Sequence, residues 1–181
     1  MPRQIFQFTV ALVGVRPPVW RRVLVPGGYT LDRLHRVVQH AMGWRDCRLH
    51  SFEIDGLQYG EPDLDGELPV RDELDVRLDA VVGKGSRFRY LYDFGDWWEH
   101  DLVVEDVCAG DQDERYPVCL DGERACPPEG VGGPSGHAVL LAALADPEHP
   151  ERRTMREWAG PGFDPAAFDA ARATTLLRRF C

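Results

Sequence analysis

The densest group of chemically active side chains lies between Tyr90 and His100, in the segment Tyr-Leu-Tyr-Asp-Phe-Gly-Asp-Trp-Trp-Glu-His. Five aromatic rings, two aspartates and one histidine surround a glycine there. A carboxylate beside an imidazole can orient the ring and stabilise its charge, as acid/base chemistry requires. Because Gly and Asp favour turns and bulges, we expect Asp93 and Asp96 at a turn close to His100.

Two faces are expected from this segment, because side chains alternate along a strand with period two. Trp98 and His100 share one side with aliphatic residues, whereas Trp97 and Glu99 share the other side with further acidic residues. His100 is therefore predicted on the apolar side. Two interpretations of Trp97 stay open, since its ring could be exposed in a ligand cleft or pack as an ordinary core residue.

A metal site is a second interpretation, because imidazole and carboxylate ligands together suit zinc, iron or manganese. No short spacing such as His-Glu-x-x-His places two ligands on one face, so the ligands would have to converge from separate strands. We favour core histidines at His50 and His100 that hydrogen-bond to carboxylates such as Asp93 or Asp96. No cofactor is therefore implied, and a metal centre is kept as the alternative, with the ligands His50, Asp93, Asp96 and His100.

Further candidates for a pocket wall are aromatic or charged side chains elsewhere in the chain. Tryptophan and tyrosine rings supply contact area together with a polar group. Arg21 and Arg22 alternate along one predicted strand, so one of them could reach the aspartate turn and form a forked ion pair. The complete predicted pocket comprises Trp20, Arg21, His35, Trp44, His50, Tyr92, Asp93, Asp96, Trp97, Trp98, His100 and Glu129.

The elements that must position these residues predict an α+β fold: a mostly antiparallel curved sheet packed against a helix of the N-terminal half, followed by a helical C-terminal region. Apolar residues recur at helical spacing between Thr30 and Gly43, which predicts a helix at residues 31–42. Alternation and β-prone composition predict strands at residues 3–15, 19–25, 49–54, 88–92 and 97–107. Further helices are predicted at residues 138–145, 151–158 and 165–180.

We predict a single domain over residues 1–181, with a strand-rich half that holds one helix (1–107), a loop (108–134) and a helical half (135–181). Residues 55–75 carry many Asp, Glu, Gly and Pro, which predicts a second, exposed loop. Residues 76–82 alternate and are expected to begin the next ordered piece.

Composition restricts the partners. A formal charge of -9 opposes the basic footprint of proteins that grip nucleic-acid phosphates. No run of eighteen apolar residues predicts a membrane span, and the N-terminus lacks a signal-peptide pattern. Five cysteines without a Cys-x-x-Cys pair argue against a disulfide framework and favour a reducing cytoplasm. The expected partner is thus an unidentified protein or small molecule, with neither nucleic acid nor membrane as the main partner.

Several motifs together resemble the plasmid pRiA4b ORF-three-like family over nearly the whole chain. They are Trp20-Arg21-Arg22, Leu34-His35, Met42-Gly43-Trp44, the segment from Tyr92 to His100, and Pro127-Pro128-Glu129 with Gly132-Gly133. The resemblance implies an α+β fold and a link to plasmids and mobile elements, and some members carry a resolvase label. A recombinase is disfavoured because the few serines and the last tyrosine, Tyr116, offer no positioned nucleophile.

Two departures from the family pattern bear on metal binding. The family usually has a His-Leu-His-like pair where this chain has Arg48-Leu49-His50, and Gly130 replaces the usual Asp after Pro-Pro-Glu. Each departure removes a potential ligand. The sequence therefore predicts a cytoplasmic binding or interaction module associated with mobile elements, and the alternative is a metal-dependent or acid/base hydrolase that uses a His/Asp site.

Overall fold

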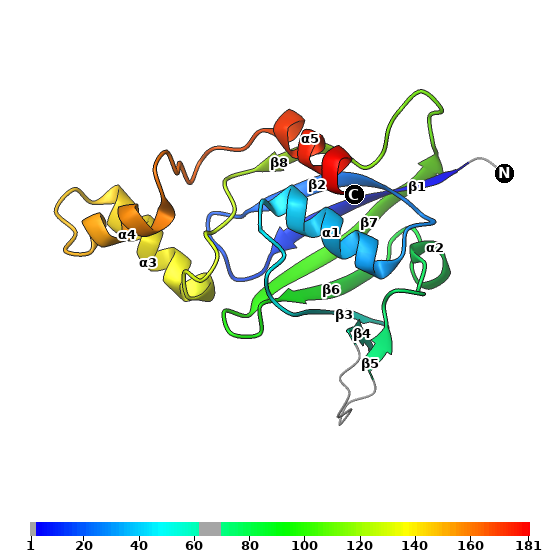
Figure 1. Cartoon of the computed structure of the whole chain (residues 1–181), viewed down its shortest axis with the longest axis horizontal. Coiled ribbons are helices and arrows are strands. Elements are labelled where there is room, and N and C mark those ends of the chain that lie inside the picture. The colour runs from blue at the N-terminus through cyan, green and yellow to red at the C-terminus, as the bar shows by residue number, and fades with distance from the viewer. Residues whose placement is uncertain (1–2, 62–69) are drawn as a thin grey trace.

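The computed structural model describes residues 3–61 and 70–181. Its centre is a sheet of eight strands in the order β5-β4-β3-β6-β7-β1-β2-β8 (Figure 1). The strands are β1 (Gln4–Leu12), β2 (Trp20–Pro26), β3 (His50–Ile54), β4 (Leu57–Gly60), β5 (Val70–Asp72), β6 (Arg87–Tyr92), β7 (Trp98–Ala109) and β8 (Val118–Glu123). All neighbouring strands pair antiparallel except β4 and β5, which are parallel. The predicted α+β class with a mostly antiparallel sheet is confirmed.

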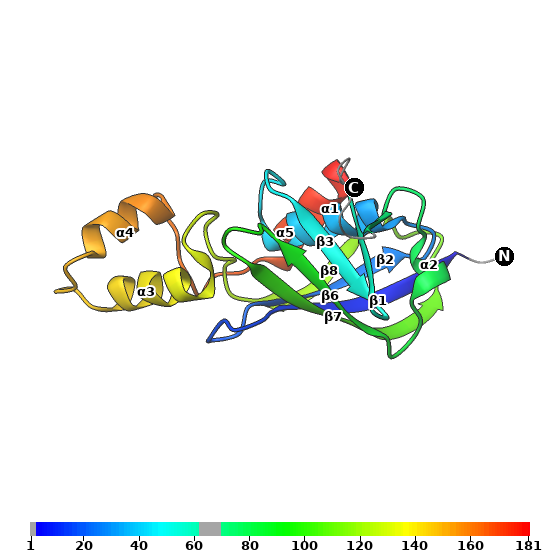
Figure 2. The same ribbon diagram turned by 90° about the horizontal axis from the view of Figure 1, so that it is seen from below.

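Helices cover one face of this sheet. Helix α1 (Leu31–Met42) has the bounds that its apolar spacing predicts, and it buries Leu31, Leu34 and Val38. Helix α5 (Ala170–Phe180) packs beside α1 and over β8 (Figure 2). The other helices are α2 (Leu78–Val81), α3 (Gly133–Ala145) and α4 (Arg152–Ala159). No helix in the described part of the chain is long and apolar enough to cross a membrane.

The core lies between the sheet and the pair α1–α5. Large side chains from the inner face of the sheet fill it, among them Phe8, Phe52, Tyr90 and Trp98, each at most 1% exposed. Burial of each such side chain stabilises the fold by about 1.5–3 kcal/mol. Helices α3 and α4 project beyond one end of the sheet (Figure 1), and no helix in residues 3–61 and 70–181 lies over the sheet's outer face (Figure 2).

Four predicted boundaries are wrong. The predicted loop at residues 55–75 contains strands β4 and β5, although residues 62–69 lie outside the described residues. The predicted loop at residues 108–134 contains β8, and α3 begins at Gly133 instead of residue 138. Residues 76–82 are ordered as expected and include a one-turn helix, α2. Helix α5 begins at Ala170, where Asp169 accepts the Arg172 N–H at 3.0 Å, and not at Pro165. Strands β4 and β5 are too short for an alternating pattern to be recognised. Such short strands depend on pairing with neighbouring strands, which the local sequence does not indicate.

Candidate functional site

The segment from Tyr90 to His100 forms the β6–β7 hairpin and supplies both faces of the sheet. Tyr90, Trp98 and His100 point into the core, with exposed fractions of 0%, 1% and 0%. Trp97 lies in the turn and is 57% exposed. The alternation predicted for the strand is therefore present, and of the two interpretations of Trp97 the structure supports the exposed one.

Asp93 builds the turn between the two strands. Its Oδ1 accepts the backbone N–H of Gly95 at 3.0 Å and that of Asp96 at 3.3 Å. The Trp97 N–H closes the turn by donating to the Asp93 carbonyl oxygen at 2.6 Å. Both Asp93 and Trp97 have φ of +56°, a left-handed conformation that costs a non-glycine residue roughly 1–2 kcal/mol. The Asp93 carboxylate is thus committed to holding a strained turn.

Asp96 connects this turn to the start of helix α3. Its Oδ2 accepts the N–H of Gly132, the N-cap residue, at 3.1 Å. A Cβ at Gly133, where φ is +67°, would collide with the Asp96 carbonyl oxygen. Two motifs of the sequence therefore meet here: the glycine pair permits the close approach, and the carboxylate lies at the positive end of the α3 dipole.

A buried polar network joins α1 to the sheet. His35 Nδ1 lies 2.7 Å from the Tyr90 hydroxyl, and His35 Nε2 lies 2.6 Å from Asp46 Oδ1. The His35 ring stacks on that of His50, with centroids 3.5 Å apart and planes at 5°. Burial, and then the neighbouring His50, lower the pKa of His35 to about 4. His35 is therefore neutral near pH 7.

The sequence predicts that His50 bonds a carboxylate such as Asp93 or Asp96, but its partner in the structure is Glu73. Its Nε2 lies 2.9 Å from Glu73 Oε2, and the Glu73 side chain is buried. Glu73 directly follows β5, which pairs parallel with β4, the strand that lies next to β3. The sequence does not predict this partner, because strands β4 and β5, which bring Glu73 to His50, lie in a segment whose composition predicts a loop.

His100 also lacks the expected carboxylate partner. Its Nδ1 donates to the carbonyl oxygens of Trp98, at 3.0 Å, and Tyr90, at 3.3 Å. Burial lowers the pKa of His100 to about 3, so the ring is neutral in the folded protein near pH 7. The bonds identify His100 as a core histidine held by its own hairpin.

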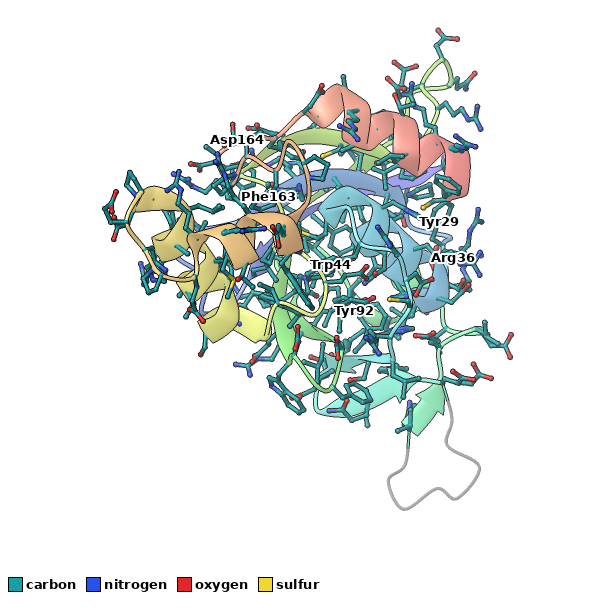
Figure 3. The ribbon with its side chains drawn as sticks, turned by 60° about the vertical axis from the view of Figure 1, so that its left-hand side comes forward. Tyr29, Arg36, Trp44, Tyr92, Phe163 and Asp164 are labelled. Atoms are coloured by element: carbon teal, nitrogen blue, oxygen red, sulfur yellow. The ribbon has the colours of Figure 1, made fainter. Side chains whose placement is uncertain are left out.

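A third cluster ties α1 to the Pro-Pro-Glu motif. Trp44 donates from Nε1 to the Pro127 carbonyl oxygen at 2.9 Å and stacks on Tyr92 at 5.0 Å (Figure 3). The Tyr92 hydroxyl donates to Glu129 Oε1 at 2.8 Å, and the Arg45 N–H donates to the same oxygen at 3.1 Å. Burial and the bond to Glu129 both raise the pKa of Tyr92. Glu129 thus fastens a long loop to the body of the fold.

Arg21 does not reach the aspartate turn, and neither does Arg22. The Arg21 side chain is buried, donates from Nε to the Ala41 carbonyl oxygen at 2.9 Å and lies over the Phe168 ring. Arg22 is on the outer face and binds Glu105 at 2.7 Å. The predicted forked pair is therefore wrong. Trp20 begins the same strand, and its indole donates to Glu123 at 3.3 Å.

The predicted metal ligands do not converge. His50 bonds Glu73, Asp93 holds the turn, Asp96 caps α3, and His100 bonds backbone carbonyls. Among residues 3–61 and 70–181, no group of three or more His, Cys, Asp or Glu side chains is arranged to hold a metal ion. We assign no cofactor to these residues.

The outer face of the sheet carries a hollow. Of its lining residues, only Trp97 belongs to the pocket predicted from the sequence. The hollow has a volume of about 390 Å³ and borders on the β6–β7 turn. Arg89 and Glu99 form an ion pair of 2.6 Å within it, and the Phe94 ring is 46% exposed at its rim. We call this hollow the Trp97 groove, and its lining residues are Ser51, Glu53, Gln58, Arg89, Leu91, Phe94, Trp97 and Glu99.

The chain is similar to one protein family, to a protein of known sequence and to a solved structure. Residues 4–172 match the family described as "Plasmid pRiA4b ORF-3-like protein". The chain is 40% identical over 170 residues to "Uncharacterized protein y4hQ" of Sinorhizobium fredii (strain NBRC 101917 / NGR234), an overlap that covers 92% of this chain and 87% of the relative. It is also similar to the crystal structure of a "Protein of Unknown Function MM3350" from Methanosarcina mazei Go1, with a TM-score of 0.87 and 32% identity over 94% of this chain and 98% of that one. The motifs quoted from the sequence, the fold and these relatives agree, and the chain belongs to the plasmid pRiA4b ORF-3-like family.

Proposed function

We propose that this protein is a binding module that recognises an extended segment of a partner protein in the Trp97 groove. The observation that supports the proposal is a tryptophan that is 57% exposed on a backbone with φ of +56°. Both features cost free energy, because the indole forgoes burial and the left-handed backbone is strained. Strained residues cluster at ligand-binding sites, where the strain pre-organises a contact.

The arrangement of the strands limits how a partner can bind. Both β3 and β6 are hydrogen-bonded to a neighbour on each side, so an incoming peptide cannot extend the sheet in this groove. Recognition therefore depends on side chains. Trp97 and Phe94 supply exposed rings of the kind that serve as binding hot spots and that line grooves for proline-rich segments.

The charge of the groove favours a basic partner. Its lining has two carboxylates, Glu53 and Glu99, against one guanidinium, Arg89, and the whole chain has a formal charge of -9. Arg89 is already paired with Glu99. Glu53 therefore leaves a net negative charge for a lysine or arginine of the partner, and a proline or other apolar side chain would lie against the rings of Trp97 and Phe94.

Selection from a phage-displayed library of random peptides on the full-length protein tests the proposal. Enriched sequences are expected to combine proline or an aromatic residue with a basic residue. A synthetic peptide of such a sequence is then titrated by calorimetry against the wild type and Trp97→Ala. Loss of a central aromatic contact costs about 2 kcal/mol, so Trp97→Ala should bind roughly thirtyfold more weakly.

The matched control is Leu120→Ala, which removes an apolar side chain that is 46% exposed on β8, at the far edge of the same sheet. This variant should bind the peptide as the wild type does. Equal affinity for wild type and Trp97→Ala would contradict the proposal, as would a library from which no binding peptide is recovered. Near-equal unfolding temperatures of the variants would show that any loss is local.

The alternative hydrolase is not proposed, because no specific observation favours it. Its four predicted residues, His50, Asp93, Asp96 and His100, each bond a different group. The setting is also part of the proposal: a single domain over residues 1–181 that acts in the cytoplasm. The five free thiols support a reducing compartment. An association with mobile elements is supported by the family name alone.

A further inference from the structure

A second hollow of about 530 Å³ adjoins the C-terminal end of α4 and is separate from the Trp97 groove. It is bounded by the end of α1, residues 125–129 and the segment that leads from α4 to α5. The two hollows share no lining residue. Its chemically distinctive lining residues are Trp44, Arg45, Glu129, Trp158, Phe163 and Arg172.

Aromatic rings enter this hollow from two parts of the fold. Trp44 belongs to the body and is fixed by its bond to Pro127 and by stacking on Tyr92. Trp158 comes from α4, is 57% exposed and belongs to a helix that buries none of its described side chains. Phe163 follows that helix and is half-buried on the same side of the molecule as Trp44 (Figure 3). The exposed indole of Trp158 is thus unexplained by packing alone.

The charge of this hollow is opposite to that of the molecule. Arg45 and Arg172 are exposed, and neither forms an ion pair with a described residue. The single carboxylate of the lining, Glu129, already accepts hydrogen bonds from the Tyr92 hydroxyl, the Arg45 N–H and the Cys47 thiol. Two guanidinium groups therefore remain available in a chain whose formal charge is -9.

We propose that this hollow binds a small molecule in which a flat ring is joined to a carboxylate or phosphate. The ring lies against Trp158 and Phe163, and the anion accepts hydrogen bonds from Arg45 and Arg172. Guanidinium groups recognise both anions through paired N–H donors, so carboxylate and phosphate are two sources of one chemistry. The volume falls within the range of ordinary small-molecule pockets.

Calorimetric titration of the full-length protein with two anionic probes and one cationic probe tests the proposal. Indole-3-acetate carries the ring with a carboxylate, adenosine monophosphate carries a ring with a phosphate, and tryptamine carries the indole with a positive charge. At least one anionic probe is expected to bind, and the two arms show which anion is preferred. Tryptamine, which has the same ring as indole-3-acetate, should not bind.

Variants of the two arginines identify the site of binding. Arg45→Gln and Arg172→Gln should each weaken the bound anion by about tenfold or more, because each removes a charge-assisted hydrogen bond. Arg87→Gln, which neutralises an exposed arginine of β6 outside both hollows, should leave the affinity unchanged. Trp158→Ala should weaken binding as well, through loss of the ring contact.

Three outcomes would overturn the proposal: no binding of either anionic probe at millimolar concentration, equal binding of tryptamine, or unchanged affinity in both Arg45→Gln and Arg172→Gln. Both arginines are exposed, so their variants should fold, and the unfolding temperature checks this. The peptide titration of the Trp97 groove uses other residues and another probe, so failure of one proposal is distinguishable from failure of the other.

Discussion

Trp97 and Trp98 are neighbours in the chain, yet their environments are opposite. Trp98 is 1% exposed and packs near Trp44 on the inner face, whereas Trp97 is 57% exposed at the edge of the outer face. Trp98 begins β7, whereas Trp97 is the last residue of the preceding turn and has a left-handed φ of +56°. A single motif therefore supplies support for the fold and a surface for recognition, and its density of functional groups does not mark a single site.

The two faces also differ in how far their distinctive side chains are exposed to solvent. On the inner face, the side chains of His35, His50 and Glu129 all hold hydrogen bonds within the protein. On the outer face, the Trp97 and Phe94 rings extend into solvent. Such partners matter because an unpaired buried polar group costs about 1–3 kcal/mol, and among the described residues Trp98 Nε1 and His100 Nε2 are buried without one. Histidine and glutamate side chains, which could have been catalytic, here join α1, the sheet and the long loop through hydrogen bonds. The Trp97 groove differs from them because its rings are exposed to solvent.

The largest contrast is expected between Trp98→Ala and Trp97→Ala in urea unfolding. Removing the buried Trp98 ring should lower the free energy of unfolding by about 3–5 kcal/mol through lost burial and the cavity left behind. Trp97→Ala should change it by less than about 0.5 kcal/mol, as is usual for exposed positions. Similar losses in the two variants would show that the faces do not differ in this way.

The second contrast is in pH dependence. The pKa of His100 is lowered to about 3 and that of His35 to about 4, from an ordinary 6.5. Below pH 6.5 the unfolded chain takes up protons that the folded protein does not. Each histidine contributes about 2 kcal/mol, so the free energy of unfolding should fall by about 4 kcal/mol between pH 7 and pH 5. Urea unfolding across this range measures the fall, and a flat profile would contradict the burial of neutral histidines.

Two variants separate the sources of this pH dependence. His35→Gln should remove roughly half of the fall, whereas the exposed Trp97→Ala should keep all of it. On the outer face, hydrogen bonds from Arg22, with smaller contributions from Thr9 and Gln7, lower the pKa of Glu105 from 4.5 to about 2. Its contribution to stability is therefore lost between about pH 4.5 and pH 2, a range that extends below the window from pH 6.5 to about pH 3 in which the two histidines act.

Local periodicity explains which features the sequence could predict. The bounds of α1, the β6–β7 hairpin and the opposite faces of Trp97 and His100 all follow from spacing within a dozen residues. Partners that are distant in sequence could not be predicted. The bond between His50 and Glu73 depends on the unrecognised β4 and β5, and Asp96 meets Gly132 only when α3 docks against the turn. The residue types predicted one polar cluster, but in the folded protein its members bond to separate partners.

Asp96→Ala should have a moderate effect that spreads from the outer turn to α3. The variant removes the acceptor of the Gly132 N–H and the negative charge at the start of the helix, so we expect a loss of about 1 kcal/mol. Hydrogen exchange should accelerate in the first turn of α3. Asp101→Ala, at an exposed position of β7, is the control and should leave this exchange unchanged. Unaltered exchange in Asp96→Ala would mean that the carboxylate does not anchor the helix.

The smallest expected effect, Trp97→Asn, has the opposite sign. Asparagine tolerates the left-handed backbone better than tryptophan does, so the variant should keep the φ of +56° with less strain. The free energy of unfolding should rise by about 0.5 kcal/mol while peptide binding in the groove is lost. Arg87→Asn, at a regular exposed position of β6, is the control and should slightly lower stability, because asparagine is unfavourable in strands. A loss of more than about 1 kcal/mol in Trp97→Asn would show that the indole stabilises the fold, and the strained tryptophan would then need no partner to explain it.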